Sequence, residues 1–96
     1  MKDSQENELL PVGSIVKIRL SKEFFVIVGF YPIEKDTEKM YDYIAVRYPY
    51  GFAGNDSFTF FNKDLVRKVI KVGYESKEDK DFKEKLKESI KKKNNK

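Results

Sequence analysis

The stretch Glu23–Tyr31, EFFVIVGFY, is apolar at nearly every position and decides how this chain folds. Its two alternating sets of residues, which point to opposite faces of a strand, both contain large apolar side chains. A strand of this kind usually lies at the centre of a sheet or is strongly curved. Gly29, which lacks a Cβ, suits a sharp corner or a close approach by another backbone. We therefore predict a β domain built around this stretch.

Shorter strand signals flank this stretch on both sides. Ser14, Val16, Ile18 and Leu20 alternate with a more polar set, which predicts a strand with one face on the core. Ser21–Lys22 then allows a short hairpin turn. After the central stretch, the pattern predicts a charged loop over residues 32–39, a third strand over 40–48 and a turn-rich loop over 49–56. A short fourth strand follows over 57–61, then one helical turn over 62–66 that is capped by Asn62, and a last strand over 69–74.

This order of elements predicts a mainly β (α+β) fold. The expected form is an SH3-like small five-stranded barrel or a strongly curved sheet over residues 9–74, followed by one C-terminal α-helix. An open five-stranded sheet gives almost the same pattern. A chain of 96 residues buries only about 60% of its unfolded surface, so its core must be dense in large side chains. Eight Phe and six Tyr supply that bulk.

The two ends of the chain differ in composition from the middle. Residues 1–8 lack apolar side chains after Met1, so we expect a disordered N-terminus. Residues 75–96 are rich in Lys and Glu at three- and four-residue spacings, which predicts a charged amphipathic C-terminal helix over 77–93. Its lysine-rich end, residues 91–96, is expected to fray.

Three apolar residues, Phe82, Leu86 and Ile90, lie four residues apart in this helix and form one narrow stripe. Such a stripe must cover other apolar surface. Two possibilities stay open: the stripe packs back on the β domain, or it docks against a partner protein.

The composition argues against catalysis. The chain contains no His and no Cys, which removes imidazole acid/base chemistry, thiolate chemistry and almost every zinc site. The carboxylates Asp42, Asp56 and Asp64 do not have the spacing of a calcium loop. We therefore expect a protein that is not an enzyme, that binds no cofactor or metal, and that acts by contact.

The sequence also favours a cytoplasmic protein. No basic-then-apolar signal segment opens the chain, and no run of about 20 apolar residues could span a membrane. The absence of cysteine suits a reducing compartment.

The positive charge lies mostly in the C-terminal tail. Residues 1–74 hold eleven Lys and Arg against ten Asp and Glu, whereas residues 75–96 hold nine Lys against six Asp and Glu. Small β domains often bind nucleic acid with aromatic and basic side chains together, so this alternative stays open. The near balance of charge in the body argues against a field strong enough for phosphate binding. The candidate cations are Lys17, Arg19, Arg47, Arg67, Lys68 and Lys71.

Aromatic residues between positions 41 and 61 are too numerous for one inward face of two short strands. Exposed Tyr and Phe around a Gly- and Pro-containing loop favour protein contact. We predict a composite docking surface made of this loop and the helix stripe; in the alternative, the loop folds over the barrel and buries its own rings. The predicted protein-binding residues are Tyr48, Tyr50, Phe52, Phe82, Leu86 and Ile90.

A series of short motifs in a fixed order resembles a known family. The motifs are Leu10–Val16 (LPVGSIV), Val26–Gly29 (VIVG), Asp42–Tyr43, Tyr48–Gly51 (YPYG), Phe60–Asn62 (FFN) and Val72–Tyr74 (VGY). Over about residues 9–74 the chain resembles the domain of unknown function numbered 4176. That family consists of small proteins of Gram-positive bacteria, encoded beside LXG-type toxins of the type VII secretion system.

The resemblance implies an accessory or targeting-chaperone role and no catalytic residues. The expected function is a non-enzymatic adaptor that binds an LXG-type toxin in the cytosol for type VII secretion. The expected partners are an LXG-domain toxin, other small accessory proteins, or both. Two alternatives stay open: a nucleic-acid-binding small β-barrel, and an immunity protein that neutralises a toxin.

Overall fold

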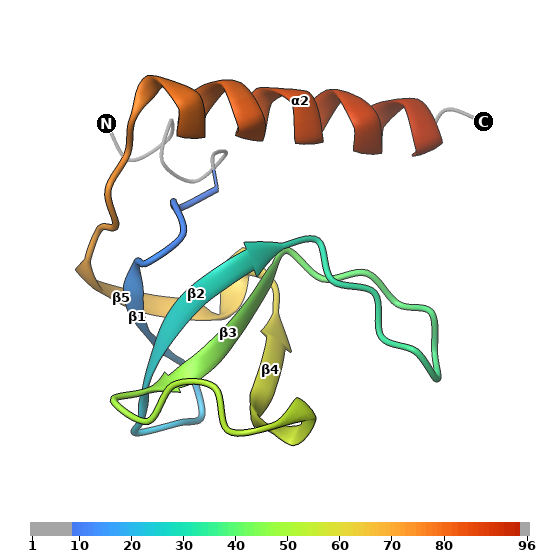
Figure 1. The fold of residues 1–96 in the computed structure, drawn as a ribbon. Helices are drawn as coiled ribbons and strands as arrows, with labels where there is room; N and C mark the ends of the chain where they lie inside the picture. The colour runs from blue at the N-terminus through green and yellow to red at the C-terminus, as the bar shows by residue number, and fades with distance from the viewer. Residues whose placement is uncertain (1–8, 95–96) are drawn as a thin grey trace.

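The computed structural model describes residues 9–94, so the expected disorder of residues 1–8 lies outside it (Figure 1). Its order of strands, short helical turn and C-terminal helix confirms the order predicted from sequence. The elements are β1 (Ile15–Ile18), β2 (Phe24–Phe30), β3 (Tyr43–Tyr48), the 3₁₀ turn η1 (Asn55–Ser57), β4 (Phe58–Phe61), the 3₁₀ turn η2 (Lys63–Leu65), β5 (Val66–Lys71) and α2 (Lys77–Asn94).

The strands form one antiparallel sheet of five strands in the order β4-β3-β2-β1-β5. β2, which contains the doubly apolar stretch, lies at the centre, as its composition predicts. A β-bulge between Ile27 and Gly29 bends this strand. A Cβ on Gly29 would lie 2.9 Å from Ile44 Cγ2, so the close neighbour of this glycine is a side chain.

The sheet is open, and the predicted closure into an SH3-like barrel or a strongly curved sheet is wrong. Closure would require the two outer strands to exchange backbone hydrogen bonds. In the described residues β4 pairs only with β3, and β5 pairs only with β1. β5 is exposed from Arg67 to Lys71. Strand order and alternation are the same in both forms, so the sequence pattern did not separate them.

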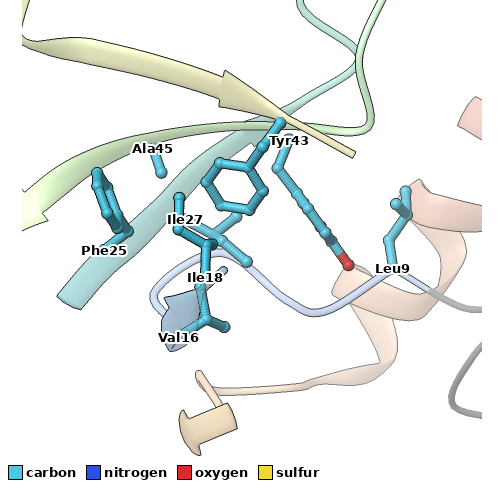
Figure 2. Close-up of a cluster of buried hydrophobic side chains, with 8 residues drawn as sticks. Leu9, Val16, Ile18, Phe25, Ile27, Tyr43 and Ala45 are labelled. Carbon is cyan, nitrogen blue, oxygen red and sulfur yellow. The ribbon is translucent and has the colours of Figure 1, made fainter. Parts of the chain in front are cut away.

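The hydrophobic core lies against one face of the sheet, which we call the core face. Three direct cross-strand pairs lie on this face: Val16 with Phe25, Ile27 with Ala45, and Tyr43 with Phe61. The Phe61 ring meets Phe25 edge-on at 6.1 Å between centroids and lies 5.7 Å from the Tyr43 ring. Figure 2 shows the cluster, whose buried members are Leu9, Val16, Ile18, Phe25, Ile27, Tyr43, Ala45 and Phe61.

Two predicted strand ends differ from the structure. The alternation predicts Leu20 on the core face, but Leu20 is 99% exposed and has a φ of 70°, because β1 ends at Ile18 and the chain turns toward β2. The last strand begins at Val66, three residues earlier than predicted, and ends at Lys71. Its start is fixed by pairing with Ile18 of β1 and by packing of Val66 against the core.

The predicted cap at Asn62 is correct in position but not in mechanism. Asn62 precedes η2, yet its side chain makes no capping hydrogen bond. Asn62 Oδ1 instead accepts a hydrogen bond from Asp42 N at 3.0 Å, and Asp42 Oδ2 accepts one from Lys63 N at 2.8 Å. This reciprocal pair joins the start of β3 to the end of β4.

Ser14 and Gly73 fasten the chain after β5 to the segment before β1. The buried Ser14 hydroxyl donates to Pro11 O at 2.7 Å and accepts from Gly73 N at 2.9 Å. The backbones are so close that a Cβ on Gly73 would overlap Val12 O and lie 2.9 Å from Ser14 N. Only glycine fits at this position without a shift of the backbone.

Helix α2 lies at the end of the sheet where β2 ends and β3 begins (Figure 1). The segment before β1 connects the helix to the core, since Leu10 N donates to the Tyr43 hydroxyl at 2.9 Å and Leu9 O accepts from Lys83 Nζ at 2.8 Å. No helix in the described part of the chain is both long and apolar enough to cross a membrane.

The Lys83 ammonium on α2 is buried and neutralised by two carboxylates. Its Nζ donates to Glu75 Oε2 at 3.0 Å and lies 3.1 Å from Asp79 Oδ2, an oxygen that has no well-aligned hydrogen bond. Burial lowers the pKa of Lys83, but the two carboxylates outweigh it, and the pKa is raised overall. The lysine therefore stays charged and holds α2 against the N-terminal segment.

We expect the protein to lose stability as the pH rises from about 10 to about 12. Burial raises the pKa of Tyr43 from 10.0 to about 12; the hydrogen bond from Leu10 opposes this rise, and the Asp42 charge adds to it. A group whose folded pKa is raised contributes stability that is complete below its unfolded pKa and is lost as the pH passes the folded pKa. The difference corresponds to about 2–3 kcal/mol, and the raised pKa of Lys83 acts in the same direction.

Urea unfolding over this pH range measures the effect, with Tyr43→Phe as the control because it lacks the titrating phenol. The variant should show a flatter pH dependence than the parent protein. Identical pH dependence in the two proteins would contradict this assignment.

Candidate protein-binding surface

The side of the sheet opposite the core is also apolar, and we call it the second face. Its residues alternate along β1 to β4 with those of the core face. Helix α2 contacts Leu9 through Lys83, and its Phe82 ring lies 6.4 Å from the ring of Phe30, which pairs with Tyr43 of the core face. These contacts do not reach the second face. The second face consists of Ile15, Phe24, Val26, Ile44, Val46, Tyr48, Phe58 and Phe60.

The second face is only partly shielded from water. Val46, at its centre, is 5% exposed because neighbouring side chains surround it, whereas Tyr48 is 48% exposed. The remaining members are half-buried. A contiguous apolar surface that stays partly exposed to water is typical of an interaction site. The second face also explains why β2 is apolar on both sides.

The loop after β3 adds two exposed aromatic rings to one end of the second face. Tyr50 is 69% and Phe52 64% exposed, so the alternative in which this loop buries its own rings is wrong. The Phe52 ring lies 5.4 Å from the Phe58 ring, and the Tyr50 ring lies 5.7 Å from the Arg47 guanidinium.

Hydrogen bonds within the loop hold these rings in place. Gly51 N donates to Arg47 O at 2.9 Å, Ala53 N donates to Ser57 Oγ at 3.0 Å, and Ser57 Oγ donates to Gly54 O at 2.7 Å. The loop therefore presents its aromatic side chains from a fixed backbone, which lowers the entropy lost on binding.

Charges mark the two margins of the second face. On the β1–β5 side, Lys17 and Lys68 are direct cross-strand partners, and Lys71 lies opposite Ile15. Like charges in such a pair oppose sheet formation. Neither Lys17 nor Lys68 makes an ion pair within residues 9–94. On the β4 side, the carboxylate of Glu34 lies beside Phe58 and Phe60.

The structure separates the predicted docking residues into two groups. Tyr48, Tyr50 and Phe52 lie at the end of the sheet where Phe24 pairs with Tyr48. The helix stripe lies at the opposite end: Phe82, 52% exposed, touches Phe30 of the pair Phe30–Tyr43. Figure 1 shows α2 and the loop after β3 at opposite ends of the strands.

The structure therefore does not bring the loop and the helix stripe together into one surface. Leu86 and Ile90 of the stripe are half-buried. Only the loop residues adjoin the second face.

The acidic residues considered for cation binding have separate structural roles. Asp42 belongs to the reciprocal pair with Asn62, Asp56 lies in η1 and Asp64 in η2. The part of the chain that the structure describes contains no group of three or more Asp or Glu that could hold a metal ion. What the second face offers chemically is apolar area, rigid rings and charge at its margins.

Sequence reasoning missed the second face as a unit, although it correctly placed Phe58 and Phe60 on one side of their strand. The missing information was strand pairing, which puts Val46 beside Phe58 and Val26. It also missed Lys83, whose only signal was Asp79 four residues earlier in the helix.

The second face, the loop and the first turns of α2 all lie within a region that matches a known protein family. The model of a family described as "Domain of unknown function (DUF4176)" matches residues 9–82. No curated protein and no solved structure matches the chain.

Proposed function

We propose that this chain, which belongs to the family described as domain of unknown function (DUF4176), is a non-enzymatic adaptor that binds another protein through the second face of its sheet. The partner that we propose is an LXG-type toxin, held in the cytosol and delivered to the type VII secretion apparatus. Other small accessory proteins would join the same complex.

The partly exposed, apolar second face is the observation that supports protein binding. A strand buried on one side only has no need of apolar side chains on its other side, yet β1 to β4 carry them on both. Tyr and Phe at protein interfaces supply large, rigid contact area at low entropy cost. Tyr48, Tyr50 and Phe52 extend this area at one end of the sheet.

The choice of an LXG-type toxin as partner comes from the family and not from the geometry. In the proposed complex the adaptor does no chemistry on the toxin. The lack of cysteine agrees with a role in a reducing compartment.

We expect Phe52→Ala and Tyr50→Ala to weaken binding of an LXG-type toxin from the same genome by about 1–4 kcal/mol each, the range of interface anchors. Both side chains are mostly exposed, so the variants should keep the unfolding free energy of the parent protein. Calorimetric titration of the full chain with the toxin, together with urea unfolding, measures both quantities.

Tyr74→Ala is the matched control, because Tyr74 is 86% exposed and lies outside the second face. Leu86→Asp tests the helix stripe separately. If the toxin binds the Phe52→Ala and Tyr50→Ala variants as tightly as the parent, the loop end of the second face does not take part in docking. If the toxin fails to bind the parent chain, the proposed partner is wrong.

A further inference from the structure

The two edges of the sheet differ in their protection against a further strand. β5 carries three cations, Arg67, Lys68 and Lys71, on six residues. Charged side chains on an edge strand oppose pairing with another chain. β4 has the sequence FTFF and carries no charge. The β4 edge is therefore the one that can accept an additional strand.

The backbone of β4 has hydrogen-bonding groups available on its outer side. β4 pairs only with β3, and in residues 9–94 its backbone makes no hydrogen bond outside the sheet. An extended segment placed beside an edge strand, about 4.8 Å away, satisfies these groups by continuing the sheet.

A hollow on the second face lies next to this edge. It has a volume of about 290 Å³ and is lined by Phe58 and Phe60 of β4 and by Glu34 and Tyr41 of the loop between β2 and β3. Figure 1 shows this loop extending on the β4 side of the sheet. Since side chains of a strand alternate between faces, every second side chain of an added strand would enter the hollow.

The hollow has a fixed negative charge on one side. Glu34 Oε1 accepts hydrogen bonds from the Thr37 hydroxyl at 3.1 Å and from the Tyr41 hydroxyl at 3.4 Å. No ion pair in the described part of the chain involves Glu34. The Lys39 ammonium lies 5.1 Å from the centroid of the Tyr41 ring but makes no ion pair with Glu34. A positioned carboxylate that lacks an ion-pair partner favours a Lys or Arg on the segment that occupies the hollow.

We propose that a partner protein contributes an extended segment that pairs with the outer edge of β4 as a sixth strand. Its alternate apolar side chains pack on Phe58 and Phe60, and a Lys or Arg of the segment faces Glu34. This inference rests on the proposed function, since it names the form in which a bound protein is held. A second copy of this chain, paired β4 to β4, fits less well, because the FTFF sequence of β4 offers no Lys or Arg to face Glu34.

The test uses two probes on the full chain: the LXG-type toxin, and dodecapeptides selected from a random phage-displayed library. We expect the selected peptides to alternate apolar residues and to contain Lys or Arg. Hydrogen exchange of the parent protein should slow at Phe58–Phe61 when a selected peptide or the toxin binds. This measurement needs no variant and so does not depend on one that folds.

Thr59→Lys places a charge on the β4 edge. It should lower the affinity of the chain for both probes about tenfold or more, a change of about 1.4 kcal/mol in binding free energy. Two matched controls should keep the parent affinity: Thr59→Val, which keeps the edge uncharged, and Ile70→Lys, which adds the same charge to the other edge strand. Glu34→Gln should lower the affinity for peptides that contain Lys or Arg severalfold.

The outcomes separate this inference from the proposed function. Toxin binding without protection of β4 overturns the inference and leaves the adaptor function standing. If selected peptides protect β4 from hydrogen exchange but the toxin does not bind, the toxin is not the partner. The proposed strand pairing at the β4 edge is then supported. Peptides with helical spacing of apolar residues, or a dimer of this chain that Thr59→Lys abolishes, overturn the inference.

Discussion

Replacement of Gly73 by alanine is expected to destabilise the protein by about 3 kcal/mol, near the upper end of the cost of overpacking. The new Cβ would overlap Val12 O and crowd Ser14 N at 2.9 Å, and neither atom can move without shifting backbone. The same shift would strain the hydrogen bond from Gly73 N to the buried Ser14 hydroxyl. Small domains have unfolding free energies of about 5–15 kcal/mol, so this loss is a large fraction of the total.

Gly51→Ala is the matched control for this prediction. Gly51 has a φ of 75°, but a Cβ at this position would meet no atom within 4 Å, so alanine there costs backbone strain without a clash. We expect a loss of about 1–2 kcal/mol. Urea unfolding of both variants gives the comparison, and equal losses would contradict the close approach of the two backbones at Gly73.

Phe61→Ala should lower the free energy of unfolding by about 3–5 kcal/mol, as expected for removal of a buried aromatic ring. Phe61 is 2% exposed and packs against both Phe25 and Tyr43. Phe60, its neighbour in β4, is half-buried on the second face and touches Tyr41 at 5.8 Å between ring centroids. Phe60→Ala should therefore cost much less.

This pair of variants compares the two faces of the sheet directly, because the two residues share a strand and differ in the face they occupy. Urea unfolding of both variants measures the difference. Similar losses for both variants would show that the second face is as well packed as the core face.

The alternation of apolar residues predicted the strands and the central place of β2, since burial on both sides leaves a direct trace in EFFVIVGFY. It did not predict the open sheet. Closure depends on whether β4 and β5 meet, and alternation within a strand carries no information on that contact. Leu20 shows a related limit: it continues the apolar pattern, but the turn toward β2 places its side chain in water.

For the candidate site, the sequence predicted exposed aromatic residues around the loop after β3, because their number exceeds what one face can bury. It also joined that loop to the helix stripe, which the structure places at the opposite end of the sheet. The distance between Tyr50 and Phe82 depends on the direction of β3 and on the end of the sheet where α2 lies, and neither follows from composition. The hollow beside Glu34 required both the strand order and the course of the loop between β2 and β3.

The contact between Lys83 and Leu9 O ties the two ends of the described chain together. Leu9 is also part of the hydrophobic core, and the next residue donates a hydrogen bond to Tyr43. The N-terminal segment and α2 therefore form one cooperative unit for local unfolding. A protease cut, a truncation or a bulky fusion that displaces Leu9 would remove the buried contact of Lys83 and loosen the C-terminal helix as well, although Leu9 and Lys83 lie 74 positions apart in the sequence.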